Sequence, residues 1–275
     1  MPAHPAFQPG KVAVITGGAD GIGLAAARHY QSIGMQVCIA DVSQEKLDQA
    51  RSQLGEVLAV TTDVASMADM ERLRDSAFER YGQVNVLMNN AGQAQHNTSW
   101  TEHAAWRATL ETNLWGVING IHSFTQAMID LGEPGVIVNT GSKQGITTPP
   151  GNPAYNASKA GVKAVTEALQ HDLRNTEGCQ LSAHLLVPGF TYTGMVKKFL
   201  PEKPDGAWTP EQVVEFMVAS LDKGDFYILC PDNDVTREAD NKRMAWAIGD
   251  LIENRPPLSR WHPDYQEEFD NFMNP

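Results

Sequence analysis

Residues 11–23 read KVAVITGGADGIG, a short apolar run followed by a glycine-rich turn. The run has the aliphatic, β-branched composition of a buried strand, and apolar residues at helical spacing follow from Gly21. Glycine at positions Gly17, Gly21 and Gly23 lets the backbone turn tightly, so that its N–H groups can approach a pyrophosphate. The dipole of the following helix points its positive end at the same negative charge. This strand, turn and helix together predict a dinucleotide-binding fold.

Outside this stretch, short apolar runs alternate with longer segments of helical periodicity. The predicted strands are residues 11–16, 36–40, 57–61, 84–88, 135–140, 181–187 and 226–230. The predicted helices are residues 21–33, 43–54, 66–81, 103–131, 154–175 and 211–221. Strict alternation with apolar strands predicts an α/β fold, a doubly wound, Rossmann-like parallel sheet with helices on both faces. We expect a single domain over residues 1–275, with a core at about 11–230 and a C-terminal helical extension at 231–275.

The pattern changes after the seventh strand. Residues 234–254 have helical spacing, and Arg255-Pro-Pro257 ends that helix. Tyr265, Phe269 and Phe272 then fall at helical spacing near the C-terminus. We expect a C-terminal helix that packs onto the body of the protein, with a lid or a subunit contact as the alternative.

Composition narrows the classes of partner. The 275 residues are 42% hydrophobic, and 21 Lys and Arg against 33 Asp and Glu give a net charge of −12. So acidic a chain disfavours nucleic acid and anionic membranes as partners. Its three cysteines are far apart, and neither a CxxC motif nor paired histidines indicate a metal site, so we expect none. Residues 1–10 lack a signal-peptide pattern and no apolar run reaches membrane-spanning length, so we expect a reduced, cytoplasmic protein.

An aspartate ends the second predicted strand. Asp41 lies about 20 residues beyond the glycine turn, where an acidic side chain binds the ribose hydroxyls of adenosine. A carboxylate there repels a 2′-phosphate, and no arginine or lysine stands beside it or in the turn. The alternative role is to cap the helix that begins near Ser43, and both roles can coexist. The sequence therefore favours NAD over NADP.

Two more segments follow predicted strands at the same edge of the sheet. After the third strand, Asp63 can accept a hydrogen bond from the adenine amino group, with the Val64 backbone helping. After the fourth strand, the small residues of Asn90-Ala91-Gly92 let the chain pass under the cofactor. Both segments extend the predicted dinucleotide site across the sheet.

The motifs taken together resemble a known family. In order, they are Thr16-Gly17-x-x-x-Gly21-x-Gly23, Asn90-Ala91-Gly92, Asn113, Ser142, Tyr155-x-x-x-Lys159 and Pro188-Gly189. Over about residues 11–230 the chain resembles the short-chain dehydrogenase/reductase family, which implies hydride transfer between a nicotinamide and an alcohol or ketone. The cofactor contacts that we expect on this basis are Gly17, Ala19, Asp20, Gly21, Ile22, Gly23, Asp41, Val42, Asp63, Val64, Asn90, Ala91, Gly92, Tyr155, Lys159, Pro188, Gly189, Phe190, Thr191 and Thr193.

Tyr155 and Lys159 are four residues apart on a predicted helix and therefore share one face. A free tyrosine has a pKa of about 10 and is a poor base at neutral pH. A nearby ammonium group and the positive nicotinamide of an oxidised cofactor favour the phenolate and lower that pKa. We expect Tyr155 to be the general acid/base of the hydride transfer. The resemblance implies that Lys159 also holds the nicotinamide ribose.

Ser142 and Asn113 complete the catalytic set that the resemblance implies. Ser142 follows the fifth strand, thirteen residues before the tyrosine, and would orient the substrate oxygen. Thr140 and Thr147 are nearby hydroxyl alternatives. Asn113 falls in the long helix before that strand, where the ordinary role of an asparagine is to face solvent. The family role is instead to hold a water that connects the lysine to bulk solvent.

The segment after the sixth strand, Pro188-Gly189-Phe190-Thr191-Tyr192-Thr193, is expected to close over the nicotinamide, as in the family. Thr193 fits the place of the threonine that bonds the carboxamide, with Thr191 as the alternative. The backbone of Phe190 can contribute as well.

The predicted substrate contacts are Gln93, Gln144, Tyr192 and Met195. Apolar and aromatic surface with a few amides suits a hydrophobic secondary alcohol or its ketone, aromatic and alicyclic ones included. Lys143 departs from the family pattern, and a surface lysine is the simplest interpretation.

The leading hypothesis is an NAD-dependent short-chain alcohol dehydrogenase or carbonyl reductase with a small-molecule alcohol or ketone as substrate. The alternatives are an NADP-dependent ketoreductase and a non-catalytic NAD-binding regulatory protein. The resemblance further implies a homodimer or homotetramer assembled through the fourth and fifth helices.

Overall fold

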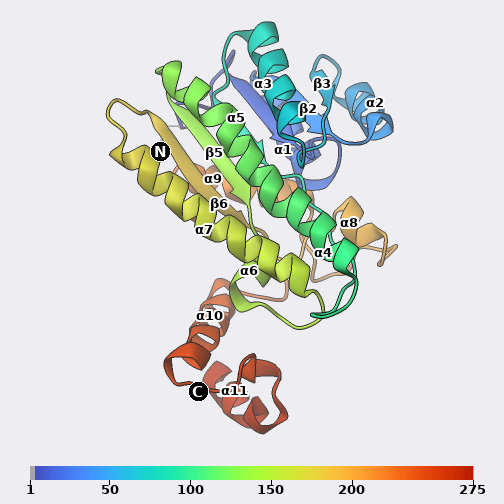
Figure 1. Cartoon of the computed structure of the whole chain (residues 1–275), viewed down its shortest axis with the longest axis vertical. Coiled ribbons are helices and arrows are strands. Elements are labelled where there is room, and N and C mark those ends of the chain that lie inside the picture. The colour runs from blue at the N-terminus through green and yellow to red at the C-terminus, as the bar shows by residue number, and fades with distance from the viewer. Residues whose placement is uncertain (1–3, 275) are drawn as a thin grey trace.

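Parallel strands form the centre of the molecule in the computed structural model, which describes residues 4–274 (Figure 1). Within these residues the strands are β1 (Val12–Thr16), β2 (Gln36–Asp41), β3 (Leu58–Thr61), β4 (Val86–Asn89), β5 (Gly135–Thr140), β6 (Leu181–Val187) and β7 (Tyr227–Leu229). They pair in the order β3-β2-β1-β4-β5-β6-β7, each pair parallel. The predicted fold class, a doubly wound Rossmann-like sheet, is confirmed.

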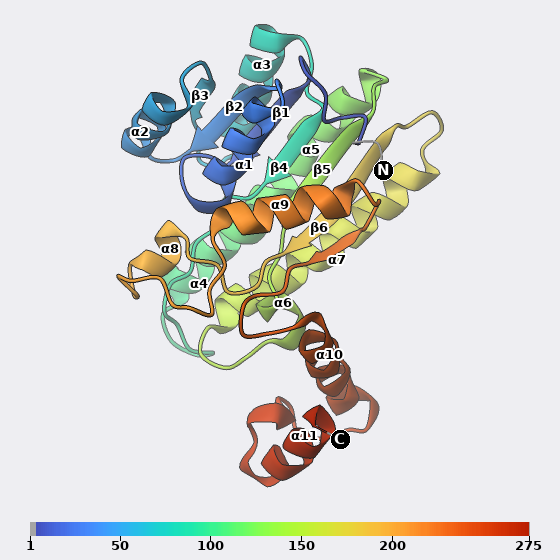
Figure 2. The ribbon, with the colours of Figure 1, turned by 180° about the vertical axis from the view of Figure 1, so that it is seen from behind.

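Helices cover both faces of the sheet because alternate strand residues point to opposite sides. In β1, Ala13 and Ile15 join one buried cluster, while Val12 and Val14 join the other. The first cluster is covered by α1 (Gly21–Ser32), α2 (Gln44–Leu54) and α9 (Pro210–Leu221), and Figure 2 shows α1 and α9 on that face. The second is covered by α3 (Met67–Tyr81), α5 (Gly116–Asp130) and α7 (Pro153–Asn175).

The long helix predicted before β5 is interrupted. It consists of α4 (His103–Leu110), a π-helical turn η1 (Glu111–Trp115) and α5. Two short helices, α6 (Gln144–Thr147) after β5 and α8 (Gly194–Lys197) after β6, were not expected. Both lie at the carboxyl edge of the sheet, where the predicted site residues are.

The C-terminal segment projects from the rest of the molecule (Figures 1 and 2). It contains α10 (Arg237–Ile252), η2 (Ser259–Trp261), η3 (Pro263–Tyr265) and α11 (Gln266–Met273). Within it, Phe269 and Phe272 pack against Trp246, with ring centroids 5.3 and 5.2 Å away. The expectation that the last helix packs onto the body is therefore wrong, because α11 uses its aromatic face to cover α10.

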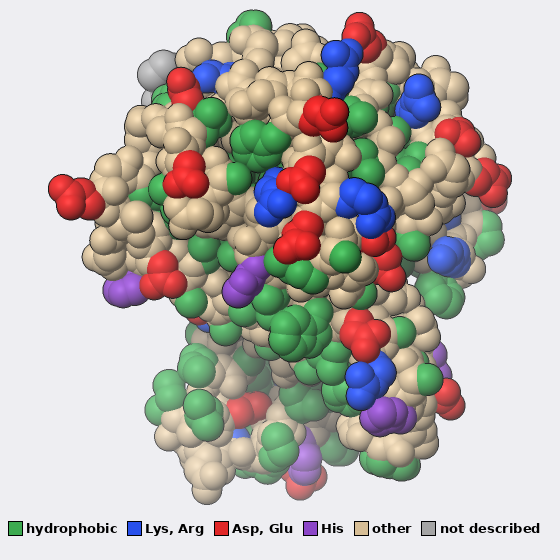
Figure 3. All heavy atoms as spheres, turned by 45° about the horizontal axis from the view of Figure 1, so that its top comes forward, with side chains coloured by type: hydrophobic (Ala, Val, Ile, Leu, Met, Phe, Trp, Pro, Cys, Tyr) green, Lys and Arg blue, Asp and Glu red, His purple; other side chains and the backbone are tan. Residues whose placement is uncertain are grey.

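Hydrophobic side chains remain exposed on this segment, and Figure 3 shows several of them over the lower part of the molecule. Ile248, Leu251 and Ile252 fall at helical spacing on α10 and are all more than half exposed. Acidic and basic side chains are scattered over the body (Figure 3). The C-terminal segment thus buries one apolar face within itself and leaves another open.

We predict that Phe124→Ala lowers the free energy of unfolding by about 3–5 kcal/mol, because the ring is fully buried between α5 and the sheet. Phe199→Ala removes the same atoms from a ring that is 73% exposed, and it should change that free energy by less than about 0.5 kcal/mol. Urea denaturation followed by circular dichroism measures both. Equal losses would mean that α5 does not bury Phe124 as described.

Candidate active site

The glycine turn joins β1 to α1. Gly17 has a backbone φ of +62°, a conformation that side chains with a Cβ rarely adopt. A Cβ on Gly23 would lie 2.2 Å from the carbonyl oxygen of Gly17, so only glycine fits there. Asp20 begins α1, and its carboxylate accepts a hydrogen bond of 2.7 Å from the N–H of Gly21. The turn therefore leaves bare backbone at the positive end of α1.

Hydrogen bonds tie this turn to the end of β4. The Asn90 amide donates to the carbonyl oxygens of Thr16 and Gly17, at 3.1 and 3.4 Å. The Thr16 hydroxyl oxygen accepts from the N–H groups of Asn90 and Ala91, at 3.0 and 3.2 Å. Asn90, expected beside the cofactor, thus positions the turn. Thr16 was missed as a positioning residue, although a hydroxyl at the end of an aliphatic strand was a visible signal.

Asp41 lies at the end of β2, and its carboxylate accepts a hydrogen bond of 3.1 Å from the N–H of Ser43. Ser43, and not Asp41, is the N-cap of α2, since its hydroxyl accepts from the N–H of Lys46 at 3.3 Å. The Lys46 ammonium reaches Asp20 in the glycine turn at 2.9 Å. No cation was expected in the turn, because Lys46 reaches it from within the next helix, α2.

Asp63 and Val64, which follow β3, differ in their exposure. Asp63 is exposed, and its carboxylate accepts from the N–H of Ala65 at 3.0 Å. Val64 is buried, and its carbonyl oxygen accepts from the Asn119 amide at 2.9 Å. The Asp63 side chain is thus open to a ligand, while the Val64 carbonyl is used to hold α5.

Tyr155 and Lys159 share the first turns of α7, as the spacing predicted. The Lys159 ammonium lies 5.8 Å from the centre of the Tyr155 ring and donates to the carbonyl oxygen of Thr140 at 2.7 Å. Lys159 is only 4% exposed, and burial lowers the pKa of its ammonium to about 8. No carboxylate in residues 4–274 forms an ion pair with it.

Ser142 is the hydroxyl that reaches the tyrosine. Burial raises the pKa of Tyr155, and a side-chain hydrogen bond from Ser142 acts in the opposite direction. The two alternatives face elsewhere: Thr140 donates to Asn90 at 3.4 Å and Thr147 to the carbonyl oxygen of Lys143 at 3.4 Å. The expected lowering of the Tyr155 pKa by the lysine is not seen, because desolvation outweighs the opposing hydrogen bond.

Asn113 lies in the π-helical turn and is fully buried, so the solvent-facing interpretation is wrong. Its amide donates to the Gln93 carbonyl at 2.9 Å and to the Ser158 hydroxyl at 3.1 Å. Its oxygen accepts from the N–H of Gln93 at 2.8 Å. A Cβ on Gly92 would lie 3.4 Å from that oxygen and 3.7 Å from the Lys159 ammonium. Turns of this kind are frequent at functional sites.

The segment after β6 crosses the glycine turn. A Cβ on Gly21 would lie 3.1 Å from the Thr193 side chain. The Thr191 hydroxyl is used locally and donates to the carbonyl oxygen of Gly189 at 3.1 Å. Thr193 therefore fits the cofactor-facing position better than Thr191. The N–H of Phe190 donates to Asp232 at 3.2 Å, which directs it toward the C-terminal segment.

The four predicted substrate contacts do not form one surface. The Gln93 amide donates into α4, to the Ala108 carbonyl at 3.0 Å and the Thr112 hydroxyl at 2.7 Å. Gln144 is exposed at the start of α6. Tyr192 and Met195 are half-buried beside or within α8. Three of the four residues thus lie on or beside α6 and α8, while the Gln93 side chain is bonded to α4 and η1.

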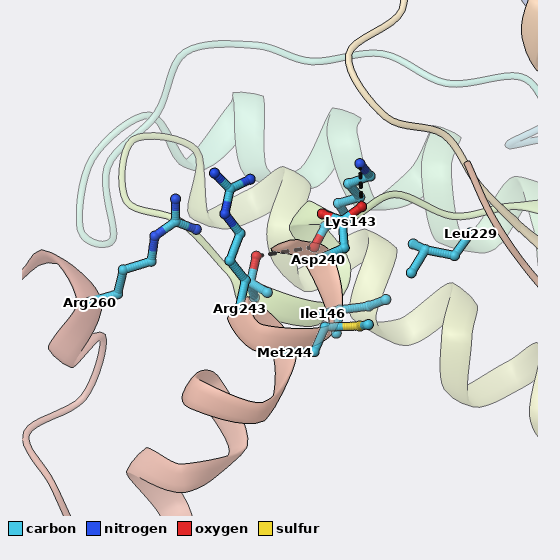
Figure 4. Close-up of a pocket in the computed structure, with 8 residues that line it drawn as sticks. Lys143, Ile146, Leu229, Asp240, Arg243, Met244 and Arg260 are labelled. Carbon is cyan, nitrogen blue, oxygen red and sulfur yellow. Dashed lines mark hydrogen bonds and ion pairs between the residues drawn. The ribbon is translucent and has the colours of Figure 1, made fainter. Parts of the chain in front are cut away.

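Lys143, the residue after Ser142, is not a free surface lysine. Its ammonium pairs with Asp240 at 2.6 Å and with Asp232 at 3.4 Å, and its side chain is 19% exposed (Figure 4). Both aspartates belong to the C-terminal region. This pairing was not predictable from local patterns, because Asp240 is far from Lys143 along the chain.

Comparison with known proteins agrees with this geometry. A family model for short chain dehydrogenases matches residues 11–204. The chain belongs to the short-chain dehydrogenase family. As a member of it, the protein is an oxidoreductase that acts on hydroxyl or keto substrates and uses a nicotinamide cofactor.

Similar members of the family cover most of the chain. A 1-deoxy-11-beta-hydroxypentalenate dehydrogenase of Streptomyces exfoliatus is 30% identical over 261 residues, which cover 91% of this chain and 94% of that protein. A 3beta-hydroxysteroid dehydrogenase 2 of Eggerthella lenta is 31% identical over 198 residues, 70% of this chain and 75% of that one. The crystal structure of a short chain dehydrogenase/reductase from Burkholderia phymatum in complex with NAD has a TM-score of 0.81 and 32% identity, covering 92% and 97% of the two chains.

Two further observations concern what this short-chain dehydrogenase lacks within residues 4–274. No group of three or more His, Cys, Asp or Glu side chains there could hold a metal ion. None of the helices in that range is both long and apolar enough to cross a membrane.

The buried Lys159 ammonium predicts a pH-dependent stability. Its pKa is about 8 in the folded protein against 10.5 in the unfolded chain, so between these values the unfolded chain binds one more proton. The free energy of unfolding should therefore rise with pH in this window, by up to about 1.4 kcal/mol per pH unit relative to Lys159→Met.

Urea denaturation at several pH values between about 8 and 10 measures this slope. Lys163→Met is the control, because Lys163 lies on the same helix but is exposed and paired with Glu167. That variant should keep the slope of the unmodified protein. If Lys159→Met kept it as well, the Lys159 charge would not be buried as described.

Proposed function

We propose that this protein is an NAD-dependent short-chain alcohol dehydrogenase or carbonyl reductase. It interconverts a hydrophobic secondary alcohol and its ketone, with Tyr155 as the general acid/base. The observation that carries this proposal is the buried Lys159 ammonium, which lies 5.8 Å from the centre of the Tyr155 ring and donates to the carbonyl oxygen of Thr140, just before Ser142. A hydroxyl and a phenol that converge on one point can hold one substrate oxygen between them.

The residues present fit a dinucleotide. The glycine turn offers bare backbone N–H groups at the start of α1, and the small residues of Ala91-Gly92 continue this surface under β4. A bound nicotinamide would supply the hydride chemistry. Thr193 and the Pro188-Gly189 backbone would hold its ring, and Lys159 would hold its ribose. We assign the adenine end to Asp41, Val42, Asp63 and Val64.

Proton transfer follows from the positions of four side chains. In alcohol oxidation, the Tyr155 phenolate oxygen accepts the substrate hydroxyl proton, while the Ser142 hydroxyl keeps the oxygen in place. In ketone reduction, Tyr155 donates that proton back. Lys159, with a pKa of about 8, exchanges a proton near working pH. Asn113 fixes the Gln93 backbone beside it, and we assign it the water link to solvent.

Two carboxylates support NAD over NADP. Asp41 ends β2, and only one of its oxygens is used by the N–H of Ser43. The Lys46 ammonium, which could otherwise attract a 2′-phosphate, is paired with Asp20. The net field at the ribose end therefore stays unfavourable for a phosphate.

Apolar side chains along the segment after β6 support a hydrophobic substrate. Phe190, Phe199 and Leu200 are all exposed, and they flank α8 at the rim of the site. The two relatives named above act, by their names, on a hydroxypentalenate and a 3β-hydroxysteroid, both bulky alicyclic alcohols. We propose a substrate of similar bulk.

We also propose that the protein is a homo-oligomer. Trp100 is 87% exposed, and together with Trp106, Leu110 and Trp115 it lines a broad groove along α4 and η1. An exposed aromatic groove of this kind is typical of protein contacts. The groove lies on the fourth predicted helix, which is α4, η1 and α5 in the structure, and the expected contact also includes the fifth, which is α7.

Tyr155→Phe tests the proposed chemistry. It removes only the phenolic oxygen, so kcat should fall by about 10²- to 10⁴-fold while the Kd for NADH changes less than about twofold. Initial rates over a panel of alicyclic and aromatic alcohols, with NADH fluorescence titration, measure both. Tyr227→Phe, which loses a hydroxyl bonded to Glu167 away from the site, should keep full activity. Unchanged turnover in Tyr155→Phe would refute the mechanism, and an inactive parent protein with intact NADH binding would favour the regulatory alternative.

Cofactor preference is tested by titration. NADH should bind at least about tenfold more tightly than NADPH, because Asp41 repels the 2′-phosphate. Asp41→Ser should narrow this ratio mainly by strengthening NADPH binding. Asp48→Ser, an exposed carboxylate of α2, should leave the ratio unchanged. Equal affinities in the unmodified protein would show the NADP-dependent alternative to be correct.

A further inference from the structure

A small charged pocket lies between α6 and the C-terminal segment. Its volume is about 60 Å³, and its walls include Lys143, Thr147, Asp240, Arg243 and Arg260 (Figure 4). Lys143 directly follows Ser142, so the pocket begins one residue from the proposed catalytic serine. Along the chain it thus begins next to the proposed active site, and α10 and η2 contribute its other lining residues.

Two arginines in this pocket lack a partner. Within residues 4–274, neither Arg243 nor Arg260 forms an ion pair, and the buried Nε of Arg243 has no hydrogen-bond partner. Figure 4 shows both guanidinium groups on the same side of the pocket and pointing the same way. The nearby Arg243 charge contributes to lowering the pKa of Arg260, after burial. Two like charges thus face one small space.

Packing holds Arg260 in this position. Its guanidinium lies 4.7 Å from the centre of the Trp261 ring and 5.2 Å from that of Phe269. These aromatic contacts fix the plane of the group and keep it from turning freely into solvent. A fixed guanidinium is already oriented for a ligand, which reduces the entropy lost on binding.

The charges around the pocket do not sum to zero. Asp232 and Asp240 supply two negative charges and both pair with Lys143. Lys143, Arg243 and Arg260 supply three positive charges, so the cluster has a net charge of +1. Like charges held close together repel each other, and one monoanion bound between them would neutralise the excess.

The geometry points to a carboxylate-binding site formed by Arg243 and Arg260. A carboxylate carries one negative charge and matches the planar fork of a guanidinium through two parallel hydrogen bonds. Its size suits a pocket of about 60 Å³, and Ile146 and Met244 provide an apolar wall for the carbon that carries it. The carboxylate is either the far end of the substrate or a separate small organic acid.

Binding of acetate tests the site without any turnover. At constant ionic strength, sodium acetate at about ten times its Kd should raise the Tm by about 3 °C more than sodium chloride does. The difference should disappear in Arg243→Gln and in Arg260→Gln. Arg237→Gln, an exposed arginine at the start of α10, should keep it.

Arg243→Lys is a second variant, which still tests the site if Arg243→Gln does not fold. It keeps the positive charge but loses the guanidinium fork. It should retain less than half of the acetate shift. No acetate shift in the unmodified protein, or the same shift in all three pocket variants, would overturn the proposal.

Kinetic measurements distinguish the two sources of the carboxylate. Unlike the acetate experiment, they rest on the proposed function. The probes are 4-hydroxycyclohexanecarboxylic acid and its amide, oxidised with NAD. If the substrate supplies the carboxylate, Arg243→Gln raises KM at least about tenfold for the acid and leaves the amide unchanged. Equal effects on both probes, with a persistent acetate shift, assign the site to a separate acid. If neither probe nor any other alcohol is oxidised, the proposed function fails, while the acetate result still decides the site.

Discussion

The hydrogen bond from the Lys159 ammonium to the carbonyl oxygen of Thr140, at 2.7 Å, is the interaction on which the candidate site depends. It joins α7 to the end of β5 and so fixes Tyr155 relative to Ser142, which follows that strand. Burying an ammonium group without a paired carboxylate costs free energy, and the pKa of Lys159 is lowered for this reason. Small and polar groups pack near the ammonium: a Cβ on Gly92 would lie 3.7 Å from it and 3.4 Å from the side-chain oxygen of Asn113.

Much of the candidate site was predictable from residue spacing within short segments. The strand, turn and helix at residues 11–23 and the Tyr155-x-x-x-Lys159 pair each fix their own geometry within a few residues. Because parallel strands end at one edge of a sheet, residues that follow different strands also had to meet there. The π-helical turn at Asn113 was not predictable, since one inserted residue hardly changes a helical pattern. Its consequence, a buried amide facing Gln93, needed the structure.

Long-range pairing accounts for the other differences. Lys46 meets Asp20, and Lys143 meets Asp240, across distances in sequence that no periodicity reports. Phe269 and Phe272 lie on one helix as predicted, while Tyr265 lies in η3, and the pattern did not identify the surface that the two rings cover. Trp246 is that surface, and its ring also contacts Arg255, whose guanidinium lies 4.0 Å from the ring centre. Aromatic residues at helical spacing predict that one face of a helix is buried, but they do not identify the residues that pack against that face.

The electrostatics of the pair explain how one site can serve both directions of the proposed reaction. Burial raises the pKa of Tyr155 and lowers that of Lys159, so near neutral pH the pair is a neutral phenol beside an ammonium group. A positive charge brought close lowers the pKa of both groups, which favours the phenolate and with it a base. Loss of that charge restores the phenol and with it an acid. The oxidised and reduced nicotinamides differ by this charge, so the redox state of the cofactor would set the protonation state that each direction requires.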